Sequence, residues 1–168
     1  SMIDEVAAKY RLKSNRVIMY GFSGGGQFCQ RFFMLHPQRL KAVSIGAPGV
    51  VTLLNSDYDW WVGVRDVEAR FGCRIDIEAM KAVTVQTVIG EEDTATWEIA
   101  IPRDSAFWMH GADLQGNCRI ERIETLARSF EKHGIPVRRD RVSGVAHEPF
   151  KVLEPVEAFF ADVLRSHG

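Results

Sequence analysis

Short apolar runs recur along the chain and predict the strands of a sheet. Residues 17–20, 42–45 and 83–89 are rich in valine, isoleucine and other strand-forming side chains, and residues 135–142 form a fourth strand-like segment. Apolar runs without a polar alternation are typical of strands that are covered on both faces. A glycine ends or follows each of the first three runs, which indicates turns at those points. We therefore predict a buried, mostly parallel sheet.

Between these strands, apolar residues recur at helical spacing. Such spacing places them on one face of a helix, where they can pack against a sheet. The predicted helices are residues 3–13, the segment that ends at about His36, the segment between a cap at Asn117 and a stop at Gly134, and the segment that opens at Glu154. Strands alternating with helices predict an α/β fold with a mostly parallel sheet of about four strands and flanking helices.

Two segments interrupt this alternation. Residues 49–81 and 94–116 both follow predicted carboxyl ends of strands, where open α/β sheets place their binding crevices. They contain all four tryptophans, Trp60, Trp61, Trp97 and Trp108. Tryptophan is more often a core residue than a ligand wall, so these side chains and Phe22 are candidates for either role. No linker or repeat divides the chain, so residues 1–168 are expected to form one domain with both insertions near the candidate site.

The stretch Gly21-Phe22-Ser23-Gly24-Gly25-Gly26 joins the first strand to the following helix. Glycines two positions before and two positions after the serine suit a sharp turn, because the backbone crowds any side chain placed there. Such a turn can hold a nucleophilic serine, but it can also bind a phosphate or simply connect a strand to a helix. We favour the nucleophile because candidate partners follow later in the chain.

A serine hydroxyl becomes a nucleophile when a base removes its proton, and the base needs an acceptor that fixes its tautomer. Asp93 directly follows the third predicted strand and His147 directly follows the fourth. All three side chains would then lie at carboxyl ends of strands in one sheet. Alternatives remain open: Glu91, Glu92 and Asp104 compete with Asp93, and His110 competes with His147, whereas His36 and His133 lie at predicted helix ends.

With these motifs in this order, the chain resembles the α/β-hydrolase superfamily, and within it the serine esterases and polyester depolymerase-like hydrolases. GFSGGG resembles the nucleophile elbow, VIGEEDT the acid-bearing loop and SGVAHE the histidine loop, and the resemblance spans essentially the whole chain. It implies that Ser23 is the acylated nucleophile, His147 the general base and Asp93 the residue that orients the imidazole. It also implies that the backbone N–H of Gly24 donates to the oxyanion.

The chain departs from this superfamily at its start. Typical members carry several strands before the elbow, and a loop after one of them supplies a second oxyanion donor; here one helix precedes the elbow. The resemblance thus implies a truncated fold and a weak catalyst, since losing one such donor costs roughly 10²- to 10³-fold in turnover. We expect a serine hydrolase that cleaves a carboxylic ester or related acyl compound through an acyl-enzyme on Ser23. The alternatives are an impaired fragment or pseudoenzyme acting as a binding or assembly module, and an acyltransferase or peptidase.

The early position of the elbow also affects the sheet edge. Residues 17–20, which are interior in the superfamily, would form an exposed apolar edge, and such edges pair with other strands. We expect a homo-oligomer that covers this strand, or a chain shortened from a natural precursor. Ser1 before Met2 resembles a residue left by cloning, so the native chain is expected to begin at Met2.

Charge and composition narrow the functional classes. Lys and Arg total 21 against 22 Asp and Glu, so no basic excess is present to bind a phosphate backbone, and we expect no nucleic acid partner. No apolar stretch approaches the ~20 residues of a membrane span, and the start lacks a signal-peptide pattern. We therefore expect a cytoplasmic protein that acts on a small-molecule acyl substrate without a membrane partner.

The cysteines, histidines, carboxylates and glycine motifs indicate no disulfide, metal site or nucleotide-binding site. The three cysteines are widely spaced and contain no C-x-x-C pair, which argues against a disulfide framework and predicts free, mostly buried thiols. No His and carboxylate cluster has the spacing of metal ligands, and no nucleotide-binding glycine motif is present. We expect neither a metal nor a cofactor.

Overall fold

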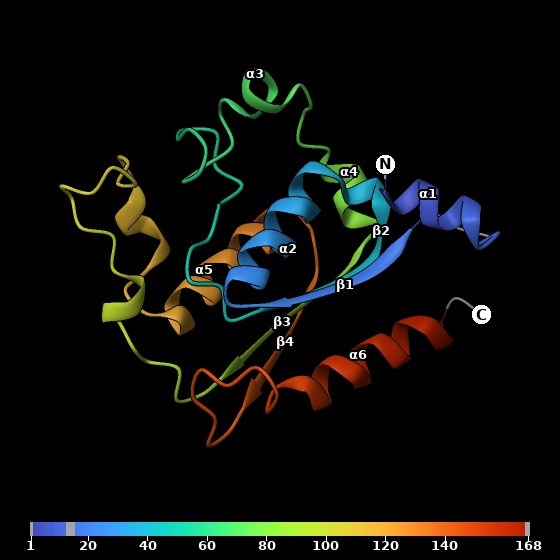
Figure 1. The fold of residues 1–168 in the computed structure, drawn as a ribbon. Helices are drawn as coiled ribbons and strands as arrows, with labels where there is room; N and C mark the ends of the chain where they lie inside the picture. Colours follow the sequence, from blue (N-terminus) through green and yellow to red (C-terminus); the bar gives the residue numbers. More distant parts are fainter. Residues whose placement is uncertain (1, 13–15, 167–168) are drawn as a thin grey trace.

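A four-stranded parallel sheet forms the centre of the molecule. The computed structural model describes residues 2–12 and 16–166. The sheet contains β1 (Val17–Phe22), β2 (Leu40–Gly46), β3 (Thr84–Gly90) and β4 (Val137–Val142), paired in the order β1-β2-β3-β4 (Figure 1). The predicted fold class is confirmed. Parallel neighbours in chain order bring the carboxyl ends of all four strands to one edge of the sheet.

Helices cover both faces of the sheet. The helices α2 (Gly24–Leu35) and α5 (Arg119–Lys132) lie on one face, and α6 (Leu153–Arg165) lies on the other (Figure 1). The larger core cluster lies under α2 and α5 and includes Phe33, Met34, Val43, Leu126 and Phe130. Burying one such side chain contributes roughly 1.5–3 kcal/mol relative to exposing it. These helices therefore hold β2 and β3 as a rigid support for the loops that follow them.

Several predicted boundaries were wrong: β1 ends at Phe22 and not at residue 20, and β2 spans Leu40–Gly46 and not residues 42–45. Three other boundaries were wrong for local reasons. The first helix, α1 (Met2–Lys9), ends before residue 11, because Arg11 has a φ of 51°, and residue 13 lies outside the described residues. The cap of α5 is Cys118 and not Asn117. β4 begins at Val137, because the N–H of Ile135 donates to the carbonyl of Phe130 at the end of α5 and Pro136 has no N–H.

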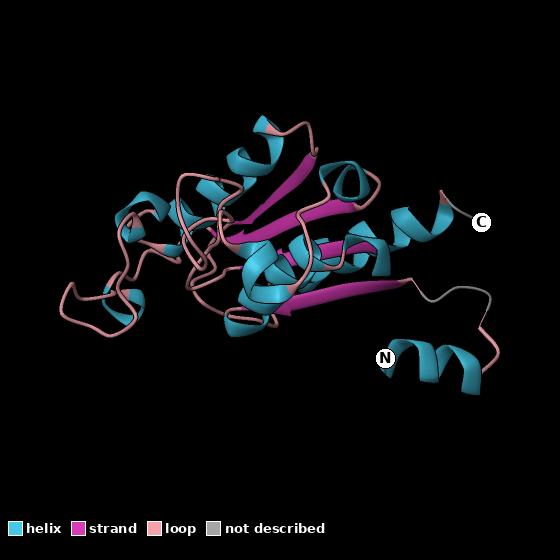
Figure 2. Ribbon diagram, turned by 90° about the horizontal axis from the view of Figure 1, so that it is seen from above, coloured by secondary structure: helices cyan, strands magenta, loops and turns pink. Residues whose placement is uncertain are grey.

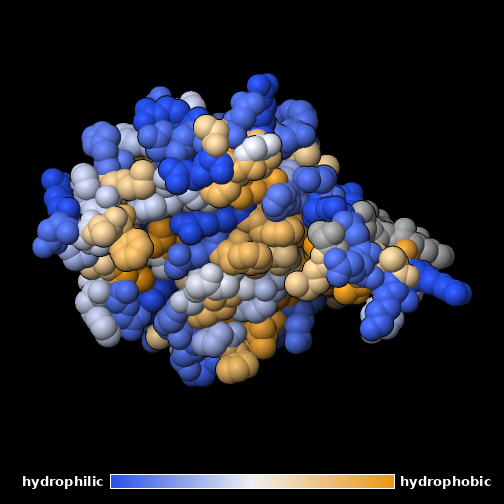
Figure 3. Space-filling model, turned by 45° about the horizontal axis from the view of Figure 1, so that its top comes forward, coloured by the Kyte–Doolittle hydropathy of each residue, from blue (hydrophilic) through white to orange (hydrophobic). Residues whose placement is uncertain are grey.

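The edge strand β1 and helix α1 are poorly covered. β1 is a terminal strand of the sheet, and Ile18 keeps 38% of its surface exposed. No residue of α1 is buried, and Figure 2 shows this helix set apart from the sheet. Apolar side chains also reach the surface elsewhere, in the middle of the face drawn in Figure 3, where polar side chains surround them. Ile18 is thus exposed as predicted for this strand, while the other five residues of β1 are half-buried.

The two insertions carry little regular structure. The segment after β2 holds α3 (Val67–Phe71) and α4 (Ile77–Lys81), and the segment after β3 holds two short 3₁₀ helices, Trp97–Ile99 and Ala112–Gln115; a further 3₁₀ turn, Pro37–Arg39, precedes β2. Gln30 of α2 anchors the first insertion, because its side chain donates to the carbonyl of Val50 (2.6 Å) and accepts from the N–H of Thr52 (3.1 Å). The insertion is thereby fixed against α2.

All three cysteines are free, but only Cys29 is buried, so the prediction of mostly buried thiols was wrong for Cys73 and Cys118. Burial raises the pKa of Cys29 to about 11, which keeps this thiol protonated at neutral pH. Among the described residues, no helix combines the length and apolar character that crossing a membrane requires.

Candidate active site

Ser23 lies on a strained turn between β1 and α2. β1 ends at Phe22 and α2 begins at Gly24, and the single residue between them has φ 55° and ψ −115°. A residue other than glycine is strained in this region of backbone dihedral angles, at a cost of roughly 1–3 kcal/mol. The Ser23 N–H donates to the carbonyl of Gly46 at 2.9 Å, while its hydroxyl does not cap the helix. The turn thus keeps the hydroxyl free of the helix that follows.

Close backbone packing explains two of the glycines around Ser23. A Cβ at Gly21 would lie 2.3 Å from the carbonyl oxygen of Gly25, and one at Gly26 would lie 2.3 Å from that of Gly46. Gly25 itself has open space around its Cα. The expectation that a side chain two positions after the serine is crowded out was therefore wrong, because the crowding falls one residue later, where α2 crosses β2.

The structure brings Asp93 and His147 into contact. The loop after β3 and the loop after β4 are joined by a hydrogen bond from the N–H of Glu92 to the carbonyl of Val145 (2.9 Å). This joint places the carboxylate of Asp93, which is 1% exposed, 2.6 Å from Nδ1 of His147. A carboxylate on Nδ1 fixes the proton at that nitrogen and leaves Nε2 as the acceptor.

His147 also lies next to the turn that carries Ser23. Its imidazole packs against the ring of Phe22, the residue directly before Ser23, with 4.7 Å between the ring centroids. Within the described part of the chain, Ser23 Oγ forms no hydrogen bond with His147. Hydrogen bonds of this kind are often long without substrate and shorten in the reacting complex.

Arg119 completes a buried charged cluster behind Asp93. Its guanidinium donates to Asp93 Oδ1 (3.3 Å) and to Glu98 Oε2 (2.9 Å), and its side chain is only 6% exposed. Sequence reasoning missed this residue. The available signal was its position as the first residue of α5, where the helix dipole disfavours a cation, so that a specific anionic partner is needed.

Arg119→Met should lower the free energy of unfolding by about 3–5 kcal/mol, because it leaves the Asp93 carboxylate buried without its cation. Urea unfolding followed by tryptophan fluorescence measures this change. Arg128→Met is the matched control, since Arg128 is exposed on the same helix and donates only to Thr125 (3.1 Å). Equal stability of the two variants would contradict a stabilising role for the Arg119 cluster.

The competing acids and histidines lie elsewhere. Glu91, Glu92 and Asp104 are exposed, and the carboxylate that pairs with His147 is that of Asp93. His110 is exposed and packs on Tyr58, with ring centroids 5.6 Å apart. His133 stands at the end of α5, where Nδ1 lies 2.9 Å from the carbonyl of Ser129, and His36 caps α2.

A cavity of about 730 Å³ opens beside the elbow. Its lining includes Trp60 and Trp61 of the first insertion, Phe107 and Met109 of the second, and Gln27 and Arg31 of α2. Ser23, Asp93 and His147 do not line it, and Gln27 lies one helical turn beyond Ser23. The cavity is therefore a neighbouring space that begins about one turn from the hydroxyl.

The other aromatic candidates have different positions. Trp97 is 77% exposed and borders a smaller cavity of about 270 Å³. Trp108 lies under the guanidinium of Arg103, 5.7 Å from the ring centroid, and its buried indole N–H has no partner among the described residues. Phe22 packs against the apolar cluster on the α6 face and against His147. Trp60 and Trp61 are thus the two tryptophans that border the larger cavity.

Gly24 is exposed and is the first residue of α2. The first N–H groups of a helix have no intrahelical acceptor and carry the positive end of its dipole, so they can donate to an anion. Across the described residues, no group of three His, Cys, Asp or Glu side chains is placed to hold a metal ion.

Comparison with known proteins adds evidence on the fold. No protein-family model matches the chain, and no curated protein matches it. Solved structures superpose on most of it, among them the following three. Poly(aspartic acid) hydrolase-1 of Sphingomonas sp. KT-1 has a TM-score of 0.71 at 21% identity, over 94% of this chain and 59% of its own. The poly(3-hydroxybutyrate) depolymerase LpqC of Bordetella parapertussis has a TM-score of 0.65 at 20% identity, over 87% and 50%.

SOBER1 of Arabidopsis thaliana is a third similar structure, with a TM-score of 0.55 at 16% identity, over 97% of this chain and 60% of its own. The chain thus spans between 50% and 60% of the length of these three proteins. At these identities the likeness concerns the fold. The protein has an α/β-hydrolase-like fold that corresponds to part of the length of these relatives.

Proposed function

We propose that the protein is a serine hydrolase that cleaves a carboxylic ester through an acyl-enzyme on Ser23. The hydrogen bond between Asp93 and His147, made beside the turn that holds Ser23, is the observation that carries this proposal. A buried carboxylate on the histidine and a strained, uncapped serine are the features that nucleophilic catalysis requires. The similar folds of a poly(aspartic acid) hydrolase and a poly(3-hydroxybutyrate) depolymerase agree with this class of chemistry.

In this mechanism Nε2 of His147 accepts the Ser23 proton while Oγ attacks the ester carbonyl. Asp93 stabilises the imidazolium without taking its proton. The C–O bond to the alcohol then breaks, and His147 returns the proton to the leaving oxygen. A water molecule, deprotonated by the same imidazole, attacks the acyl-enzyme. The bond from the acyl carbon to Oγ breaks, and His147 returns the proton to Ser23, so that one ester and one water yield one acid and one alcohol.

The oxyanion that forms during both attacks needs hydrogen-bond donors. The N–H of Gly24 is proposed as one donor, because it lies at the amino end of α2 directly after Ser23. A second donor in this fold comes from an earlier loop. Loss of one such donor costs roughly 10²- to 10³-fold in turnover, so the rate should depend strongly on how many donors face the oxyanion.

Diisopropyl fluorophosphate provides the direct test. We expect one covalent adduct per chain, located by peptide mass spectrometry on Ser23. Trypsin should release residues 17–31 as one peptide that also contains Cys29, so fragmentation must separate the two. The Cys29 thiol should stay unmodified, since its pKa of about 11 keeps it protonated.

The absence of an adduct on a folded chain would contradict the proposed hydrolase. It would favour the alternative in which this fold serves as a binding or assembly module. Adduct formation at a residue other than Ser23 would contradict the assigned nucleophile and leave the fold assignment unaffected.

A further inference from the structure

Three arginines lie partly or fully buried near the candidate site, and they differ in how their charge is balanced. Arg119 pairs with Asp93 and Glu98. Arg122 has no carboxylate, but its guanidinium donates to the carbonyls of Gly49 and Gly116. The charges of both side chains are therefore balanced by groups of the protein itself, although the buried Nε of Arg119 has no hydrogen-bond partner among the described residues. Their roles are to hold the loops that follow β2 and β3.

Arg31 is not balanced in this way. Its Nε donates to the hydroxyl of Thr52 (3.3 Å), and its guanidinium lies over the ring of Trp60, 5.6 Å from the centroid. Among the described residues, no carboxylate forms an ion pair with it, and its two terminal nitrogens make no hydrogen bond. Burial lowers the pKa of Arg31, which reflects the cost of holding this cation away from water.

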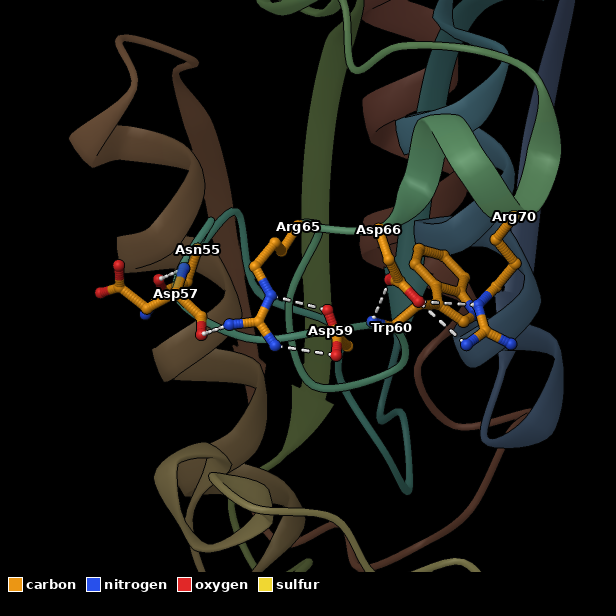
Figure 4. A network of polar contacts seen from close by, with 7 residues as sticks. All are labelled: Asn55, Asp57, Asp59, Trp60, Arg65, Asp66 and Arg70. Carbon is orange, nitrogen blue, oxygen red and sulfur yellow. Dashed lines mark hydrogen bonds and ion pairs between the residues drawn. The ribbon is translucent and has the colours of Figure 1, made fainter.

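The other charged groups that line the same cavity already have partners. Figure 4 shows that Asp66 accepts from Arg70 (2.9 Å) and also from the N–H of Trp60 (2.7 Å). The nearby Arg65 is paired with Asp59 (2.7 Å) in the same network. Glu98 is paired with Arg119. Within the described part of the chain, one uncompensated positive charge, that of Arg31, thus remains on the wall of the cavity.

The helix α2 connects this charge to the candidate nucleophile. Ser23, Gln27 and Arg31 are spaced by four residues, which places them along one face of the helix. The rise from the first to the last is about 12 Å, and a long side chain such as that of Arg31 leans toward the amino end of the helix, where Ser23 lies. A ligand that reaches from the elbow into the cavity would therefore meet Gln27 first and the guanidinium of Arg31 next.

We propose that the cavity binds an acyl ester that carries a carboxylate at the far end of its chain, with Arg31 as the residue that recognises this carboxylate. The proposal rests on the proposed function. A guanidinium fork matches a carboxylate with two parallel hydrogen bonds, and its single positive charge balances a single negative one. Trp60, Trp61 and Phe107 supply apolar surface for the connecting chain.

A pair of matched esters tests this assignment. The p-nitrophenyl monoester of suberic acid carries a free carboxylate, and its methyl-capped counterpart is neutral. We expect the wild-type kcat/KM to be higher for the anionic ester. Arg31→Met should lower the ratio of the two kcat/KM values by about 10- to 100-fold, the effect of losing charge-assisted hydrogen bonds. Arg31→Lys should give an intermediate ratio, because lysine keeps the charge without the fork.

Arg128→Met is the control, since it removes an exposed guanidinium from α5 that does not line this cavity. Its ratio should equal that of the wild type. The same ratio in the wild type, Arg31→Met and Arg31→Lys would overturn the carboxylate site. This outcome would leave the hydrolase proposal intact, because both esters would still be cleaved.

A binding measurement separates the two proposals. Isothermal titration calorimetry should show that suberate binds to the Ser23→Ala variant. The double variant Ser23→Ala/Arg31→Met should not bind suberate, whereas the double variant Ser23→Ala/Arg128→Met should still bind it. Binding with this pattern in a chain that cleaves neither ester would support the carboxylate site and contradict the hydrolase. No suberate binding to Ser23→Ala would overturn the site, whatever the rates of ester cleavage.

Discussion

Ser23→Ala should reduce the hydrolysis of a p-nitrophenyl ester by about 10⁴- to 10⁶-fold in kcat, the range found when such a nucleophile is removed from a working site. Without the hydroxyl no acyl-enzyme forms, and the remaining groups can only assist direct attack by water. Alanine has the same backbone restrictions as serine at a φ of 55°, so the turn itself should persist. Stopped-flow and steady-state release of p-nitrophenol measure the effect.

Two further variants make this result specific. Ser143→Ala removes an exposed hydroxyl from the loop after β4 and should leave the rate unchanged. Ser23→Gly should be as inactive as Ser23→Ala. Its free energy of unfolding should be higher than that of Ser23→Ala by about 1 kcal/mol, because glycine adopts the strained backbone of the turn freely. Substantial activity in Ser23→Ala would show that another residue carries the acyl group.

Asp93→Asn should lower kcat by about 10⁴-fold, and the reason lies in Arg119. The guanidinium of Arg119 donates to Oδ1, so it should hold the amide oxygen of the introduced asparagine on its own side. The amide NH₂ would then face Nδ1 of His147 and force the ring proton onto Nε2. An imidazole with its proton on Nε2 cannot accept the proton of Ser23, although every side chain remains in place.

Glu92→Gln is the matched control for Asp93→Asn. Glu92 is the neighbouring carboxylate, it is exposed, and Asp93 rather than Glu92 forms the hydrogen bond with His147. Its variant should retain the wild-type kcat. Equal losses in both variants would indicate that the acidic loop acts through its general charge. Circular dichroism spectra and melting temperatures of the two variants check that the fold is retained.

The sheet could be predicted from the sequence because its central strands are fully covered. A strand buried on both faces is mostly apolar, so Val43 and Ile45 stand out without knowledge of their neighbours, even though the buried Ser44 lies between them. The positions of Asp93 and His147 could be predicted for a related reason. Parallel strands bring their carboxyl ends to one edge, and each residue follows one of these ends.

The charge balance of the site could not be predicted from the sequence. Arg119, Arg122 and Arg31 look alike in a sequence, and their partners lie 21 or more residues away or within the loops. The same limit applies to Trp97, which is exposed, and to Trp60, which borders the larger cavity. Which side chain meets which depends on how the two insertions pack, and no local periodicity encodes that packing.

The position of β4 at the end of the sheet affects how long the protein should keep its activity when it is heated. Terminal strands have one neighbour and open more readily than central ones. If β4 separates briefly from β3, His147 leaves Asp93, while the larger apolar core around β2 and α2 stays assembled. The rate at which the protein loses activity on heating would then depend on how often β4 opens. This loss would occur at temperatures below the midpoint of global unfolding.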